Sequence, residues 1–156
     1  MRLITLTTLL LLSTFSWAGS AIEHLLSAST PPHGVVFEVV ESDDDALEWA
    51  IPEIRNYVQR LRHRYPDIEI AVVAHGSEQF SLTRANAGIK AEIHKGVQSL
   101  VQDSSVPVHV CGTHAGWYGV TPEDFPEYVD VAPAGPAQIH QYEELGYELV
   151  RIQGPD

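Results

Sequence analysis

Residues 68–74 read IEIAVVA, and this stretch decides the class of fold. It is almost continuously apolar and rich in β-branched residues, which favours a β-strand. A strand that is apolar at nearly every position is typical of a parallel sheet, where both faces are covered. The turn sequence YPD leads into the stretch, and His75-Gly76 follows it. We therefore predict a buried strand of a parallel sheet here.

Four further segments have the same apolar character and complete the predicted sheet. They are residues 34–40 (GVVFEVV), 106–111, 128–132 and 146–152. Apolar residues at helical spacing lie between them, over about 43–65, 87–102 and 136–145. Pro52 lies inside the first of these helices, so the helix either begins near it or is kinked there. Strands that alternate with helices predict an α/β sandwich with a mostly parallel, five-stranded sheet.

The first 21 residues have the pattern of a secretory signal peptide. Arg2 gives an early positive charge, an apolar run covers residues 3–12, and small residues follow it. The run is shorter than the roughly 20 apolar residues that a membrane-spanning helix needs. We predict cleavage after Ala18 or Ala21. The mature protein is then exported to the periplasm and has no membrane segment.

The remainder of the chain has the length of one domain. We predict a linker over residues 22–33 and a single α/β domain over residues 34–156. The formal net charge of the chain is −12. Nucleic acids and anionic membrane surfaces bind clustered Lys and Arg side chains, so neither is an expected partner.

Cys111 is the only cysteine in the 156 residues. Disulfides form in oxidising compartments, but a lone cysteine has no partner within its own chain. The thiol is therefore a small buried hydrophobic group, an intermolecular crosslink, a metal ligand or a reactive nucleophile. Cys111 and His75 end successive predicted strands. Because ligands gather outside the carboxyl ends of parallel strands, this position favours a function for both residues.

Four stretches together resemble the DsrE/DsrF-like sulfur-relay family. They are GVVFEVVE, YPDIEIAVVAHGSEQFSL, VPVHVCGTHAGWYGV and VDVAPAGPAQIHQYEELGYELV. The most specific parts are Pro133-Ala134-Gly135 ahead of a helix and Gly146-Tyr147, and the strand-ending cysteine followed by Gly119-Val120. The resemblance covers essentially the whole mature chain.

This resemblance implies a flavodoxin-like, three-layer α/β sandwich and an assembly of identical chains, as a trimer or a hexamer. In sulfurtransferase members, the cysteine at the end of this strand accepts sulfur as a persulfide and passes it on. Cys111 takes that role by resemblance, without a cofactor. The implied partners are sulfur donor and acceptor proteins or small sulfur compounds. The best-understood members are cytoplasmic, whereas this chain has the pattern of an exported protein.

A sulfur carrier needs a thiolate, and a nearby cation or a helix N-terminus lowers the pKa of a thiol. No Lys or Arg lies near Cys111 in the sequence, so histidines are the expected source of positive charge. The candidates are His75, His109 and His114. Backbone N–H groups of the segment GTHAG are also expected around the sulfur, with Gly112 and Gly116 letting the backbone fold tightly.

The same segment also allows a metal site. His109, Cys111 and His114 offer two imidazoles and a thiolate, a set suited to zinc or copper, and His75 is a fourth candidate. His109 and Cys111 share one face, because side chains alternate along a strand. The alternative function is therefore a non-catalytic binding module for a metal ion or a small sulfur compound. The spacing lacks the second ligand pair that makes zinc motifs specific.

Overall fold

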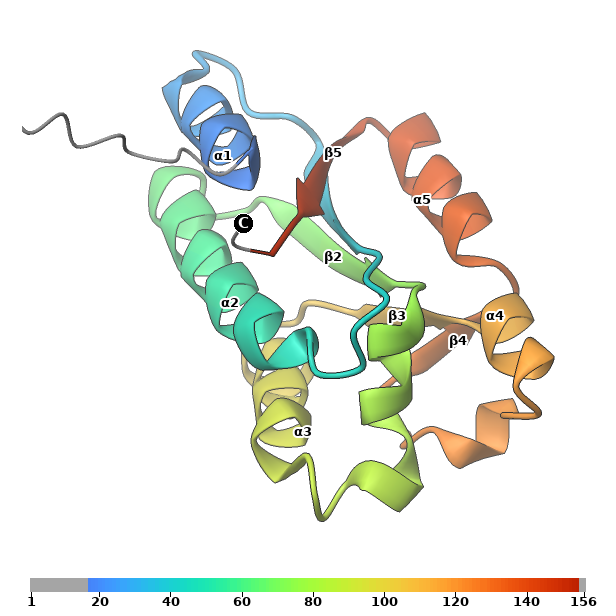
Figure 1. The fold of residues 1–156 in the computed structure, drawn as a ribbon. Helices are drawn as coiled ribbons and strands as arrows, with labels where there is room; N and C mark the ends of the chain where they lie inside the picture. The colour runs from blue at the N-terminus through green and yellow to red at the C-terminus, as the bar shows by residue number, and fades with distance from the viewer. Residues whose placement is uncertain (1–16, 155–156) are drawn as a thin grey trace, which may run out of the picture.

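The computed structural model describes residues 17–154 and shows a single parallel sheet with helices on both sides (Figure 1). The strand order is β4-β3-β2-β1-β5, and every neighbouring pair is parallel. The strands are β1 (Gly34–Val39), β2 (Glu69–Ala74), β3 (Val108–Cys111), β4 (Asp130–Ala132) and β5 (Tyr147–Ile152). The predicted α/β class and all five predicted strands are confirmed. Because the sheet is entirely parallel, the carboxyl ends of its strands lie at one edge.

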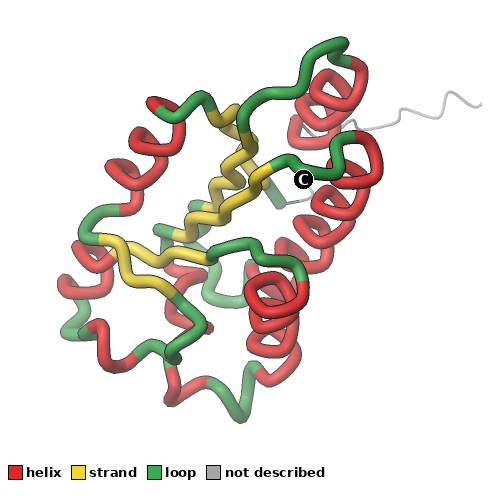
Figure 2. The backbone as a smooth tube through the Cα atoms, turned by 180° about the vertical axis from the view of Figure 1, so that it is seen from behind, coloured by secondary structure: helices red, strands yellow, loops and turns green. Residues whose placement is uncertain are grey.

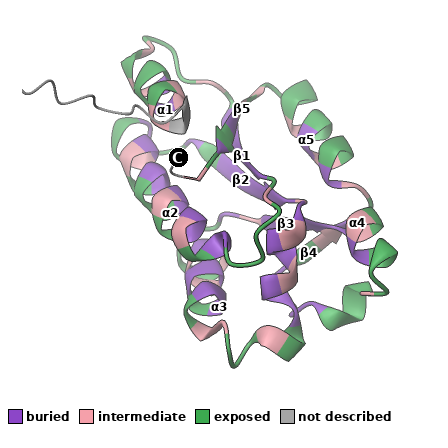
Figure 3. Ribbon diagram, viewed as in Figure 1, coloured by how far each residue is buried: buried purple, intermediate pink, exposed green. Residues whose placement is uncertain are grey.

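One face of the sheet is covered by α1 (Trp17–Ser27), α2 (Leu47–Arg64) and α3 (Ala91–Gln98). Alternate strand residues point to these helices and form the main core, which Figure 3 shows as buried strands. From the four longest strands they include Val35, Phe37, Val39, Ile70, Val72, Ala74, Val108, Val110, Val150 and Ile152. Side chains alternate along a strand, so every second residue contributes to this core.

The connections on this face differ in detail from the predicted helices. Helix α2 begins at Leu47, so Pro52 lies inside it rather than at its start. The segment predicted as one helix over 87–102 contains α3 and a π-helical turn, η3 (Ser99–Asp103). Two 3-10 turns precede it, η1 (Ser77–Leu82) and η2 (Arg84–Asn86).

Helix α1 corrects the predicted linker over residues 22–33. Residues 22–27 are helical, and Ile22 and Leu25 are buried in the main core, so only residues 28–33 connect α1 to β1. The bulk of the predicted signal peptide, residues 1–16, lies outside the described residues. Within residues 17–154, no helix combines the length and the apolar character needed to cross a bilayer.

The opposite face is covered by α5 (Gly135–Glu144), which stands across the strands from α1 and α2 (Figure 2). The apolar cluster under α5 is small, with Val36, Ala71, Val73 and Ile139 as its buried members. The short helix α4 (Gly112–Trp117) follows β3 directly, and the 3-10 turn η4 (Pro122–Asp124) leads to β4. Polar side chains occupy the α5 face where the strands end.

Candidate functional site

Two predicted site residues meet at the carboxyl ends of β2 and β3. Ala74 of β2 pairs with Val110 of β3, and the residues that follow them are His75 and Cys111. Gly135, the first residue of α5, packs against both of them. A Cβ atom placed on Gly135 would lie 2.5 Å from the Cβ of His75 and 3.4 Å from that of Cys111. The structure therefore brings His75 and Cys111 together on the α5 face.

Cys111 is both the last residue of β3 and the N-cap of α4. Its Sγ accepts a hydrogen bond from the backbone N–H of His114 at 3.4 Å. The positive end of a helix and an N–H donor give the sulfur an electropositive setting. The residue is 5% exposed, so little of the thiol reaches the surface.

The turn from β3 into α4 is fixed by contacts with the segment that follows β4. Both the backbone N–H and the hydroxyl of Thr113 donate to the carbonyl oxygen of Pro133, at 3.0 and 2.7 Å. A Cβ on Gly112 would lie 3.1 Å from the carbonyl oxygen of Ala132, so glycine suits this close approach. Gly116 has open space around it. Only the first of the two glycines is therefore needed for the tight turn.

Gln79 is a site residue that the sequence analysis missed. It comes from η1, directly after the end of β2, and its side chain is completely buried. Its Oε1 accepts the backbone N–H of Cys111 at 2.7 Å, and its Nε2 lies 3.1 Å from Nδ1 of His114. One amide therefore contacts both the cysteine backbone and the histidine ring. No sequence motif marks it, and only its place after His75-Gly76 hints at the site.

His114 is held beside the thiol by its Nδ1 atom and by aromatic rings. Nδ1 lies 2.9 Å from the carbonyl oxygen of His75. The rings of Phe80, Trp117 and Tyr118 have centroids 5.4–5.6 Å from the imidazole centroid. Trp117 is 76% exposed and Tyr118 is 66% exposed. The imidazole thus contacts the exposed aromatic rings at the end of α4 and the ring of Phe80 from η1.

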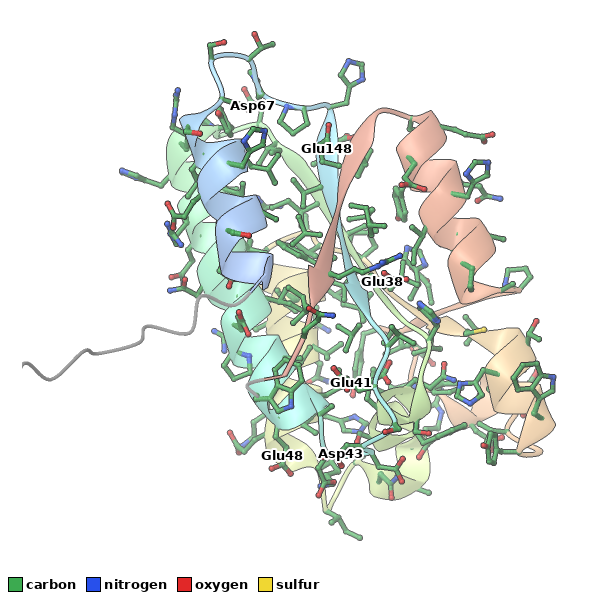
Figure 4. All side chains as sticks on the ribbon, turned by 45° about the horizontal axis from the view of Figure 1, so that its top comes forward. Glu38, Glu41, Asp43, Glu48, Asp67 and Glu148 are labelled. Carbon is green, nitrogen blue, oxygen red and sulfur yellow. The ribbon has the colours of Figure 1, made fainter. Side chains whose placement is uncertain are left out.

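His75 is connected to a buried carboxylate. Its Nε2–H donates to Oε1 of Glu38 at 2.9 Å, and Arg151 of β5 donates to Oε2 of Glu38 at 2.5 Å. Figure 4 shows Glu38 on the side of the sheet that faces α5. The hydrogen bond from His75 lowers the pKa of Glu38 against the opposing effect of burial, and Arg151 adds to the lowering. Glu38 therefore orients the His75 ring as a charged acceptor.

Arg151 extends this network to the surface. Its side chain is mostly exposed, and it borders an open cavity of about 610 Å³. Among the described residues, Ala21, Leu149 and Gln153 also line this cavity. Two hydrogen bonds, from Arg151 to Glu38 and from His75 to Glu38, therefore connect this cavity to His75, which packs next to Cys111.

Glu78 ties together the ends of β1 and β2. It is completely buried and accepts the backbone N–H groups of Glu41 at 2.8 Å and Gly76 at 2.9 Å. Figure 4 shows Glu41 beyond the end of β1. Burial raises the pKa of Glu78, although the two N–H donors oppose the shift. This carboxyl group fixes the loop from which Gln79 also comes.

The ring of His109 contacts α5. Its Nε2 lies 2.8 Å from the hydroxyl of Tyr142 on α5, and burial lowers the pKa of His109. Within residues 17–154, no three His, Cys, Asp or Glu side chains are arranged to hold a metal ion. The structure therefore does not assemble His109, Cys111 and His114 into a metal centre, although it does bring His114 to the thiol.

Comparison with known proteins supports the fold. No protein-family model and no curated protein sequence matches the chain. A protein of unknown function from Methanobacterium thermoautotrophicum, MTH1491, has a similar structure, with a TM-score of 0.58 and 23% sequence identity over 77% of this chain and 99% of its own. The ychN protein from E. coli is similar at a TM-score of 0.48 and 12% identity, over 76% and 99% of the two chains. The chain has the flavodoxin-like α/β fold of DsrE-type structures.

Proposed function

We propose that the protein belongs to the DsrE/DsrF-like sulfur-relay family and carries sulfur as a persulfide on Cys111. The observation that carries this proposal is the N–H···S hydrogen bond from His114 to Cys111 at the start of α4. The N–H donor and the helix N-terminus place partial positive charge beside the sulfur, which is the atom that a sulfur carrier uses as a nucleophile. His114 donates its backbone N–H to the sulfur, His75 and Cys111 both pack against Gly135, and the DsrE-type fold supports the same assignment.

The reaction is the transfer of a sulfane sulfur. The Cys111 thiolate attacks the terminal sulfur of a donor persulfide, and a new S–S bond forms at Sγ. The S–S bond of the donor breaks. The donor leaves as a thiol and takes the proton that its persulfide group supplied. The oxidation states of the sulfur atoms are exchanged between donor and acceptor, so no external oxidant is needed.

Access to the sulfur is restricted in this conformation. Cys111 is 5% exposed, with Gly135, His75 and His114 around it. Loading therefore requires movement of these covering groups. The exposed Trp117 and Tyr118 lie at the end of α4 and offer a contact surface for a donor or an acceptor.

The proposal is tested by the intact mass of the folded protein after incubation with polysulfide. We expect a mass increase of one sulfur atom that a reducing agent reverses, and no increase in Cys111→Ser. Serine is similar in size, so the variant should stay folded. If Cys111 accepts sulfur only after the protein is unfolded, the proposal is wrong. If the thiol reacts only after a chelator removes a bound ion, the metal-binding alternative replaces it.

We also propose export, with cleavage after Ala18. Ile22 is fully buried in the main core, and cleavage after Ala21 would remove the first turn of α1 and leave residues 22–27 alone. Cleavage after Ala18 removes only the first two residues of α1 and leaves residues 19–27. N-terminal sequencing of periplasmic protein should find Gly19 as the first residue. Retention of Met1 in a membrane fraction would contradict the proposed localisation.

A further inference from the structure

Two large aromatic side chains are exposed at the end of the helix that begins at Cys111. Trp117 is the last residue of α4 and Tyr118 is its C-cap, and most of each side chain is open to solvent. Both rings are packed at one edge. Tyr118 contacts the ring of Phe80 at a centroid distance of 5.1 Å, and Trp117 contacts the ring of His114 at 5.6 Å. Exposed aromatic rings held in this way are typical of contact sites for a partner.

The segment that follows these rings is acidic. Residues 119–129 contain Glu123, Asp124 and Glu127, all three exposed, and no Lys or Arg. Arg84 contacts the segment from η2, where its Nε donates to the carbonyl oxygen of Glu123 at 3.2 Å. Three carboxylates against one guanidinium leave an excess of negative charge beside Trp117 and Tyr118.

The loop after β1 makes the same edge of the sheet more acidic. It carries Glu41 and the three aspartates at 43–45, and Figure 4 shows Glu41 and Glu48 at this end of the sheet. Lys90 is bound by Asp45 and Glu48, at 2.5 and 2.9 Å, so its charge is matched. The basic residues at the end of α2 gather in its last turn, toward the amino ends of the strands. The edge that holds Cys111 therefore has an excess of negative charge.

We propose that the α4 surface, made of Trp117, Tyr118 and the carboxylates of Glu123, Asp124 and Glu127, docks a basic, arginine-containing segment of a partner protein. Arginine fits both features, because its guanidinium stacks on aromatic rings and pairs with carboxylates. The inference rests on the proposed persulfide function, in which the partner is the sulfur donor or acceptor. A second copy of this chain fits poorly, since its own α4 surface would bring carboxylates against carboxylates. The acidic edge also steers a basic partner toward Cys111.

The test offers the full mature chain a set of synthetic peptides of equal length. Each has a central cysteine persulfide flanked by Arg, by Gln or by Glu, and intact mass follows the loading of Cys111. At about 20 mM salt, we expect the Arg peptide to load about ten-fold faster than the Gln peptide, with the Glu peptide slowest. The advantage should fall to about two-fold at about 500 mM salt, because salt screens exposed charges.

Matched double variants separate the α4 surface from the overall charge. Glu123→Lys with Glu127→Lys reverses charge on the α4 surface. Asp67→Lys with Asp103→Lys makes the same change at the amino ends of the strands, where both residues line one cavity. All four side chains are exposed. The first pair should abolish the preference for the Arg peptide and the second should keep most of it. Equal responses of the two pairs would overturn the proposal.

The aromatic part of the α4 surface has its own variant. Trp117→Ala should slow loading from the Arg peptide about two- to five-fold, in line with the loss of an exposed cation–π contact. Loading from the Gln peptide should change less. Comparing one peptide between variants cancels the chemical reactivity of the peptide itself. Equal slowing of both peptides would show that Trp117 supports the site without stacking on arginine.

Binding without sulfur transfer separates the α4 surface from the proposed function. Peptides with serine in place of the persulfide are titrated into ¹⁵N-labelled protein, and the Arg peptide alone should shift the amide signals of Trp117, Tyr118 and residues 121–127. If it does so while no peptide loads Cys111, the proposed function is wrong and the docking surface stands. If the Arg and Glu peptides bind alike, the docking surface is wrong, whether or not Cys111 carries sulfur. If the same signals shift when the protein alone is diluted, a second copy covers the surface and the proposal also fails.

Discussion

The two faces of the sheet are made from alternate residues of the same strands, yet they differ in chemistry. The face under α1, α2 and α3 is apolar along its length and holds large side chains such as Phe37. Under α5, the buried apolar cluster is small, with Val36, Ala71 and Val73 from the strands and Ile139 from α5 itself. Toward the strand ends, the α5 face continues with Glu38, His75, His109 and Cys111.

This difference separates stability from chemistry within one small domain. The apolar face supplies the greater part of the hydrophobic stabilisation, which scales with the apolar area removed from water. The α5 face can then hold polar groups, because each is hydrogen-bonded. Within residues 17–154, no buried side-chain nitrogen or oxygen lacks a hydrogen-bond partner. Substitutions on the first face should therefore cost the most stability, and those near the strand ends of the second face should also change the reactivity of Cys111.

The largest expected effect is on the apolar face. Phe37 is fully buried and stacks on Tyr57 at a centroid distance of 6.1 Å. Phe37→Ala should lower the free energy of unfolding by about 3–5 kcal/mol, because it leaves a cavity in the core. Urea denaturation measures the loss. Leu149→Ala is the control on the α5 face, where Leu149 is only partly buried and should cost clearly less. Equal losses would contradict the proposed division between the faces.

The next effect concerns the buried carboxyl group that holds the strand ends. Glu78→Ala removes the acceptor of two backbone N–H groups, those of Glu41 and Gly76. We expect a loss of about 1–3 kcal/mol in the free energy of unfolding, the cost of leaving buried donors unpaired. Glu148 is exposed, so Glu148→Ala should change stability by less than about 0.5 kcal/mol. Similar effects of the two substitutions would show that the loop is held by other contacts.

A third prediction tests the contact between α5 and the site. In Gly135→Ala, the new Cβ would lie 2.5 Å from the Cβ of His75, so His75 or α5 must shift. We expect a stability loss of about 1–3 kcal/mol from overpacking and a changed alkylation rate at Cys111. Gly116→Ala is the matched control, since no atom lies within 4 Å of its new Cβ. That variant should gain about 0.4–1 kcal/mol, and an unchanged Gly135→Ala protein would refute the predicted clash.

The sequence predicts the strands well and the segment between β2 and β3 poorly. The strands are recognisable because short, continuous runs of β-branched residues favour strands over other secondary structures. Ile89 shows why the predicted helix over 87–102 begins too early. It fits the apolar period of a helix, but it precedes the start of α3 and is 82% exposed. Helix α1 was missed because its small residues also match a signal cleavage site. A local sequence pattern can be compatible with two structures. Tertiary contacts decide between them, and the local pattern does not show the outcome.

The site shows the same limit at the level of side chains. Cys111 and His75 could be predicted as neighbours, because parallel strands end at one edge of the sheet. Gln79 lies 32 residues from Cys111 in sequence, and its contact depends on how η1 folds back over β3. The bond from Arg151 to Glu38 spans 113 residues and depends on β5 joining the far edge of β1. Such contacts follow from topology and register rather than from spacing in the sequence.

The smallest expected effect is the pH dependence from His109 on the α5 face. Its side chain is 12% exposed, and burial lowers its pKa from the ordinary value of 6.5, with partial opposition from Asp130. A histidine whose folded-state pKa is lowered stabilises the fold in its neutral form. Its contribution is fully present above pH 6.5 and is lost as pH falls through the folded-state pKa, because the unfolded chain binds the proton more readily.

We therefore expect the free energy of unfolding of wild type to decrease between about pH 7.5 and about pH 5.5, and His109→Gln to lack this part of the decrease. Glutamine can still hydrogen-bond to the hydroxyl of Tyr142, so the fold should be retained. His140→Gln on the exposed side of α5 is the matched control and should follow wild type, because this side chain is 71% exposed. Urea denaturation at both pH values measures the slope. If His109→Gln and His140→Gln lose stability equally on acidification, the pH response does not come from the buried ring.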